Sequence, residues 1–224
     1  MEHSENGTTS MMKQQAAGKE KNKTNQLEKR NEKKAWPDSM RLTMAAFCIT
    51  LNFVGAYLAL CLKLPIYLDS IGTILAGAVL GPWYGMAVAM GSGLISGVTS
   101  DIYAIYFMPA GMITGFVAGF LFRTRLFDKK RMPIGTAFIT LPGTAASASI
   151  SAFLFHGVTS SGSSILVQML SHLGCSMVVS AFVVQIVTEY ADRFLSVALV
   201  LVLRACMTTD MKARLKGGQS HGTV

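Results

Sequence analysis

Six apolar segments, separated by short polar connections, dominate the sequence between residues 41 and 188. A helix needs about 20 mostly apolar residues to cross a bilayer, and somewhat fewer suffice where the bilayer thins. The chain is 51% hydrophobic and 14% charged, whereas a soluble domain carries about a quarter charged residues. The pattern therefore predicts an all-α integral membrane protein built as a six-helix bundle. The predicted crossings cover residues 41–62, 66–80, 82–99, 104–122, 133–156 and 165–188.

Basic residues gather at one set of predicted helix ends. Residues 1–38 hold 8 of the 20 Lys and Arg residues, and the loop 123–131 and the C-terminal tail hold others. The connections at the opposite ends carry only Lys63, Asp69 and Asp101 as formal charges. Because Lys and Arg are retained on the cytoplasmic side, both termini are predicted in the cytoplasm of a prokaryotic cell, with Asp69 near the outer face of the plasma membrane. The net charge is thereby explained without a nucleic-acid partner.

The ends of the chain differ in composition from the apolar region. Residues 1–38 are rich in Lys, Glu, Asn and Gln, which predicts a disordered cytoplasmic tail before a transmembrane domain at 39–190. Residues 191–224 are predicted to form an amphipathic surface helix and a basic tail, because a polar stripe there opposes Phe, Leu and Val. A seventh crossing is the alternative. The stripe consists of Glu189, Asp192, Arg193, Ser196 and Arg204.

Motifs of membrane-embedded catalysis are missing from the sequence. Ser92, between two glycines, could be a nucleophile and His156 or His172 a base, but no further element of a nucleophile constellation accompanies them. There is no HExxH motif and no Walker A loop. The four cysteines are scattered without a CxxC pair. We therefore expect no enzymatic activity, no cofactor and no metal ion.

Polar side chains collect in three connections on the predicted outer side, at 67–73, 99–106 and 156–172. Converging hydrogen-bonding groups and aromatic rings are typical of a site for a small polar molecule. Polar groups at the edge of an apolar helix are costly and tend to have a function. For Asp69, capping the first turn of the second helix is an alternative role. The expected ligand contacts are Tyr67, Asp69, Asp101, Tyr103, His156, Gln168 and His172.

Small residues recur at a spacing of four in the third and fourth segments, where Gly85, Ala89 and Gly93 are followed by Gly111 and Gly115. Such ridges let two helix backbones approach closely. Packing within one bundle is the simpler interpretation. The alternative is a contact surface for a partner protein, which would make the chain a membrane scaffold or sensor module without a small-molecule ligand.

Two longer stretches resemble a known family. The run LPIYLDSIGTILAGAVLGPWYGMAVAMGSGLISGV and the following MPAGMITGFVAGFLFR helix are similar to the substrate-binding (S) components of energy-coupling factor transporters. FHGVTSSGSSILVQML and ADRFLSVALVLVLR also match patterns in uncharacterised members. The resemblance covers about residues 40 to 206, with the LD-x-IGT and GPW-x-G combination as its most specific part.

The resemblance implies a non-enzymatic subunit that captures a water-soluble vitamin or related micronutrient at the extracellular face. It also implies three protein partners, namely a membrane coupling component and two cytoplasmic ATPases that drive uptake. In the family the loops between helices 1–2, 3–4 and 5–6 cap the ligand site. An AxxxA pattern on the first helix often docks the coupling component, and a relaxed version of it occurs here. Its residues are Ala45, Ala46, Ile49 and Thr50.

Overall fold

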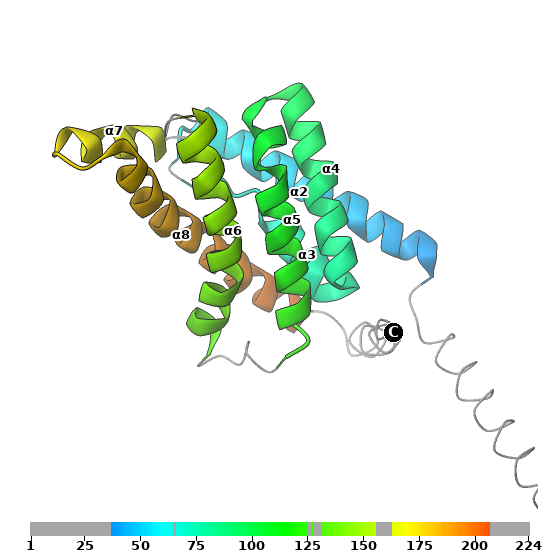
Figure 1. The fold of residues 1–224 in the computed structure, drawn as a ribbon. Helices are drawn as coiled ribbons and strands as arrows, with labels where there is room; N and C mark the ends of the chain where they lie inside the picture. The colour runs from blue at the N-terminus through cyan, green and yellow to red at the C-terminus, as the bar shows by residue number, and fades with distance from the viewer. Residues whose placement is uncertain (1–36, 65, 125–126, 128–130, 156–162, 207–224) are drawn as a thin grey trace, which may run out of the picture. The chain divides into compact units, whose positions relative to one another are not determined.

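The computed structural model describes residues 37–64, 66–124, 127, 131–155 and 163–206. These residues form helices and connections without a strand, so the all-α prediction is confirmed. Five of the described helices are long and two are short (Figure 1). The long ones are α2 (Asp38–Cys61), α4 (Pro82–Thr99), α5 (Tyr103–Leu121), α6 (Met132–Phe155) and α8 (Met177–Cys206). The short ones are α3 (Ile71–Leu80) and α7 (Ser163–His172).

Membrane character follows from the long helices. By length and composition, α2, α5 and α6 could each cross a membrane. Large apolar side chains such as Leu42, Val98 and Phe153 are exposed on the helix surfaces, where lipid would cover them. The chain is therefore a membrane protein with transmembrane helices. The predicted bundle of six crossings is not confirmed, and the differences lie at the second and sixth segments.

The second predicted crossing is a ten-residue helix entered through an irregular connection. At 1.5 Å per residue, α3 measures about 15 Å, half of the apolar thickness of a bilayer. Lys63 and Leu68 both have φ of 49°, a left-handed conformation that ends any helix before residue 71. The amide of Leu68 donates instead to Asp192 Oδ1, at 2.9 Å. All residues of α3 from Ile71 to Val79 are buried, so this short helix is the centre of the bundle.

The sixth predicted crossing is also divided. Helix α7 ends at His172, and Gly174 has φ of 96°, a conformation that glycine adopts without a steric penalty. Ser176 then begins the next helix, because its hydroxyl accepts a hydrogen bond from the Val179 amide at 3.4 Å. Helix α8 continues without a break to Cys206. A separate surface helix at 191–206 is therefore absent.

The polar stripe of α8 faces the inside of the protein. The exposed fractions are 6% for Glu189, 2% for Asp192 and 1% for Ser196, whereas Val187 and Val202 on other faces are 65% and 57% exposed. The residues of the stripe were predicted correctly, but they face the protein interior and not the cytoplasmic water. An apolar face is stable against lipid, so the polar face of such a helix can turn toward partners in the core.

Glycines hold the central helices close together. A Cβ atom on Gly115 of α5 would lie 2.5 Å from the Gly85 carbonyl oxygen of α4, and one on Gly85 would lie 3.0 Å from the Gly77 Cα of α3. At the end of this crossing, Gly119 packs against Pro82. These glycines therefore serve packing between helices of the chain itself.

Candidate ligand-binding site

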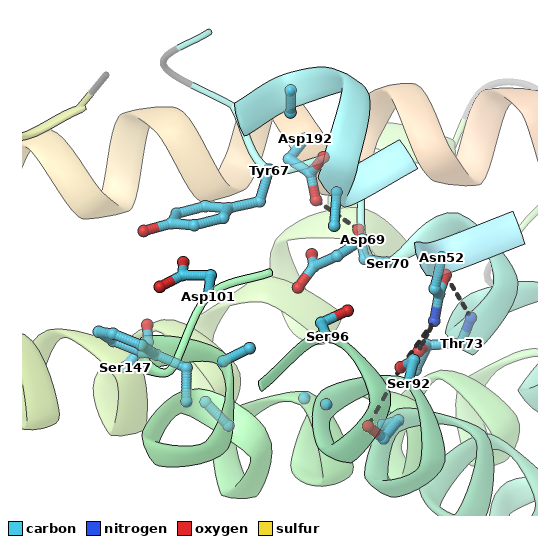
Figure 2. A pocket seen from close by; sticks show the side chains of 18 of the residues that line it. Asn52, Tyr67, Asp69, Ser70, Thr73, Ser92, Ser96, Asp101, Ser147 and Asp192 are labelled. Atoms are coloured by element: carbon cyan, nitrogen blue, oxygen red, sulfur yellow. Dashed lines mark hydrogen bonds between the residues drawn. The ribbon is translucent and has the colours of Figure 1, made fainter. Parts of the chain in front are cut away.

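A cavity of about 120 Å³ lies between α8 and the helices α4 and α5, beside the connection that leads into α3 (Figure 2). This space is well above the roughly 10–15 Å³ that a cavity needs to hold one water, so it has room for a small molecule. Apolar and aromatic side chains form part of the wall, including Phe53, Tyr57 and Phe107. Polar groups reach it from helices far apart in the sequence, among them Asn52, Ser96 and Gln185.

Two carboxylates from different connections point into this cavity. Figure 2 shows Asp69, just before α3, and Asp101, just before α5, directed into the same space with the Tyr67 ring beside them. Asp101 Oδ1 accepts a hydrogen bond from the Tyr103 amide at 3.1 Å, which fixes the turn into α5. Asp69 lines the cavity and has exposed surface.

Asp69 belongs to the connection between helices, and its acidity reflects its surroundings. Burial raises the pKa of the Asp69 carboxyl to about 6, because a charge is less stable away from water. The neighbouring Asp192 carboxylate acts in the same direction, whereas the Arg193 guanidinium opposes it. Asp69 thus changes its charge within a mildly acidic pH range.

A charged triad on α8 forms the floor of the cavity. Arg193 Nη2 lies 3.2 Å from Glu189 Oε2, and its Nη1 lies 3.3 Å from Asp192 Oδ2. The same guanidinium donates to the Thr114 hydroxyl of α5 at 3.3 Å. Because both acids are on the same helix as the arginine, one turn of α8 carries three buried charges, in which one cation is shared by two acids.

Hydroxyl groups from α6 and from the connection before α3 satisfy the acids of the triad. Glu189 accepts from the Thr144 hydroxyl of α6 at 2.9 Å and from the Ser147 hydroxyl. Asp192 accepts from the Ser70 hydroxyl, which also lies 3.1 Å from the Ser196 hydroxyl. The triad therefore ties α8 to α5, α6 and the start of α3 through hydrogen bonds to charged groups, the stronger class of such bonds.

The N-terminus of α3 is capped from another helix. Asn52 of α2 accepts from the Gly72 amide at 2.6 Å and the Thr73 amide at 3.3 Å. Its amide nitrogen donates to the Thr73 and Ser92 hydroxyls, at 2.8 and 3.3 Å. Ser70, the residue at the cap position, makes no capping hydrogen bond with its side chain. Asn52 therefore caps α3. The structure does not show the helix-capping role that was the alternative prediction for Asp69.

Four of the seven predicted ligand contacts line the cavity, namely Tyr67, Asp69, Asp101 and Tyr103. Their contact with a ligand stays a prediction. Gln168 and His172 are exposed on α7, which packs against α8, and they do not line the cavity. Their distance from it follows from the break at Gly174, which makes α7 a separate helix. His156 lies outside the described residues.

The residues of the relaxed AxxxA pattern lie on two sides of α2. Ala46 and Thr50 are exposed, and the Thr50 hydroxyl donates to the Ala46 carbonyl at 3.0 Å. Ala45 and Ile49 are half-buried, and a Cβ atom on Gly91 of α4 would lie 2.9 Å from Ile49 Cδ1. Ile49 therefore packs inside the bundle, which leaves the other side of the pattern facing outward.

Four important wall residues were not predicted as contacts, namely Asn52, Glu189, Asp192 and Arg193. The available signal was the rarity of amide and charged side chains within apolar helices. For Glu189, Asp192 and Arg193, the sequence pattern instead predicted a helix face directed toward water. Among the described residues, no group of three or more His, Cys, Asp or Glu side chains could hold a metal ion.

The aromatic residues at the start of α5 meet the end of α6. The Tyr103 and Tyr106 rings pack edge-on against Phe155, with ring centroids 4.8 and 5.2 Å apart. The Phe107 ring lies on the same side, with its centroid 6.1 Å from that of Phe155. This cluster fixes the α5 side of the cavity, where Tyr103 and Phe107 line the wall.

Comparison with protein families corrects the resemblance drawn from the sequence. Residues 23–189, well over half of the chain, match the family described as the 5TMR of 5TMR-LYT, a five-transmembrane family. The assignment to the S components of energy-coupling factor transporters is therefore wrong. The LD-x-IGT and GPW-x-G motifs, on which that assignment mainly rested, lie at the start of α3 and at the turn of Gly81 and Pro82, where they serve helix packing.

No curated protein and no solved structure matches the chain. Three of the described helices, α2, α5 and α6, could cross a membrane by length and composition, and the family is a five-transmembrane one. The match ends at residue 189, inside α8 and just before Asp192 and Arg193. The chain belongs to this five-transmembrane family, the 5TMR of 5TMR-LYT.

Proposed function

We propose that this bundle is a membrane-embedded binding module that captures a small water-soluble molecule in the cavity between α4, α5 and α8. The observation that carries the proposal is the cavity itself, where polar groups from α2, α4, α6 and α8 converge next to aromatic side chains. Pockets with a mostly apolar wall and a few fixed polar groups are the usual form of a small-molecule site.

Binding without catalysis is the activity that the side chains support. The Ser92 hydroxyl donates to the Ala89 carbonyl at 3.2 Å and accepts from the Asn52 amide. Its contacts are those of a structural serine, whereas a nucleophile would be bonded to a base. The acids of the α8 triad are likewise engaged with Arg193 and with hydroxyl groups.

A protein scaffold without a ligand is the less favoured function. The small-residue ridges that would carry a partner are occupied within the chain, because Gly85 faces Gly115 and Gly93 faces Met108. The ligand-binding proposal also covers a sensor, provided that the sensor detects a small molecule in this cavity.

Native mass spectrometry of the detergent-solubilised full chain, purified from rich medium, tests the proposal. We expect a retained small molecule at one per chain. Ala56 lines the cavity from α2, so Ala56→Phe should abolish retention by filling the space. Ala46→Phe, the same change at an exposed position of the same helix, should leave retention unchanged. Equal retention in both variants, or an empty wild type that no small molecule stabilises, would contradict the proposal.

A further inference from the structure

The charge balance of the cavity wall is strongly one-sided. Among the residues that the structure describes, four carboxylates and a single guanidinium line it, which gives these groups a net charge of three negative units when all of them are ionised. The acids are Asp69, Asp101, Glu189 and Asp192, and the cation is Arg193. A wall with this excess of negative charge attracts a cation and repels an anion.

The arginine in the wall cannot neutralise Asp69 as well as its own partners. Arg193 is 7% exposed, with one terminal nitrogen on Asp192 and the other on Glu189 and Thr114. Its remaining nitrogen, Nε, is buried and has no hydrogen-bond partner among the described residues. The guanidinium is therefore held by its partners on α8 and α5, and its Nε can still donate one hydrogen bond.

Asp69 is the carboxylate that most clearly faces the open space. The backbone amide of Asp69 donates a hydrogen bond to its own carboxylate. The neighbouring carboxylates of Asp192 and Glu189 disfavour a negative charge on Asp69. Figure 2 shows Asp101 across the same space, so two carboxylates from different connections can approach one group between them.

Aromatic rings complete the surroundings of this space. Tyr67, Tyr103 and Phe107 line the cavity together with the two carboxylates. The faces of aromatic rings attract a cation, and their surfaces also bury an apolar body. Anionic ligands are disfavoured, because the wall would repel them.

We propose that the ligand of this cavity is a small organic cation, a protonated amine on an apolar body, with its ammonium group held between Asp69 and Asp101. The inference rests on the proposed binding function and gives it a ligand class. The ammonium would donate hydrogen bonds to both carboxylates, and the aromatic side chains would surround the body. Arg193 holds the triad in place and so keeps its acids from competing for the ligand.

Three probes of one size and different charge test the ligand class, namely benzylamine, benzyl alcohol and benzoate. Isothermal titration calorimetry on the detergent-solubilised full chain gives the affinity for each. We expect benzylamine to bind at least about ten-fold more tightly than benzyl alcohol, since only the amine pairs with a desolvated carboxylate. Benzoate should be the weakest of the three.

Two matched variants locate the effect. Asp69→Asn should remove the preference for the amine, while Asp38→Asn should keep it, because Asp38 is an exposed acid at the start of α2. Equal affinities for amine and alcohol, a preference for benzoate, or an unchanged preference in Asp69→Asn would overturn the cation proposal while leaving a binding module intact. Absence of saturable binding by any probe, together with an empty wild type in mass spectrometry, would overturn both proposals.

Discussion

At the scale of single residues, the stability of the bundle centre depends on Arg193. Its two ion pairs and the hydroxyl groups on Glu189 and Asp192 satisfy charges that would otherwise be buried alone. A buried pair contributes little compared with apolar residues, but removing one member leaves an uncompensated charge. The triad therefore affects the stability of the bundle mainly when one of its members is removed.

Replacing Arg193 alone should be strongly destabilising. Arg193→Met leaves Glu189 and Asp192 buried without their cation, and we expect a loss of about 3–5 kcal/mol in the free energy of unfolding. Thermal or denaturant unfolding of the detergent-solubilised protein measures the change. The neutral triple variant Glu189→Gln, Asp192→Asn, Arg193→Met should lose clearly less. A triple variant as unstable as the single one would show that shape, and not charge, dominates at this site.

At the scale of elements, long apolar helices are predictable from sequence and broken ones are not. The segment predicted at 82–99 matches α4 residue for residue, and those at 104–122 and 133–156 match α5 and α6 within one residue. These helices need only an apolar run of sufficient length. The connection into α3 depends on Asp192, about 120 residues later in the chain, which binds the Leu68 amide. Window-based patterns contain no such long-range information.

The candidate site divides in the same way. Tyr67, Asp69, Asp101 and Tyr103 could be predicted, because polar and aromatic residues in connections between apolar helices have few structural roles. Glu189, Asp192 and Arg193 were recognised as a stripe but were assigned to the water-facing side. Amphipathicity defines two faces without saying which one meets the core, and in a membrane the apolar face turns outward.

The crossing of α3, α4 and α5 provides a test at this scale. Gly115→Ala would place a methyl group 2.5 Å from the Gly85 carbonyl, so the helices must separate, at a cost of about 1–3 kcal/mol in stability. Gly111→Ala is the matched control on the same helix, since its methyl group would lie 3.5 Å from Ala89 Cβ, an ordinary contact. Unfolding midpoints of the two variants measure the difference. Equal midpoints would show that this crossing is not tightly packed.

At the scale of the whole molecule, α8 links the cavity to the basic end of the bundle. The Arg204 guanidinium lies 5.5 Å above the Phe122 ring, which stacks on Phe127 in the basic loop 123–131. The end of α8 and this loop therefore lie at the same end of the bundle. Since Lys and Arg are retained in the cytoplasm, we propose that both face inward and that the connections with Asp69 and Asp101 face outward.

Reporter fusions test this orientation. A fluorescent protein fused after residue 206 should fold and fluoresce in the cytoplasm, whereas alkaline phosphatase at the same position should be inactive, because it matures only outside. Insertion of each reporter after Lys63, in the connection before α3, should give the reverse pattern. Active phosphatase at the C-terminal position would contradict the proposed orientation.

If Asp69 receives a cationic ligand inside the bundle, the affinity for benzylamine must depend on pH. The pKa of Asp69 is raised to about 6, so the carboxylate is ionised above that pH and neutral below it. Its charged neighbours Asp192, Glu189 and Arg193 are engaged with one another. Affinity should therefore rise about ten-fold between pH 5 and pH 7.5, as roughly one pH unit separates pH 5 from this pKa. In Asp69→Asn the profile should be flat. A flat profile in the wild type, or the same rise in Asp69→Asn, would show that the Asp69 carboxylate does not pair with the cation.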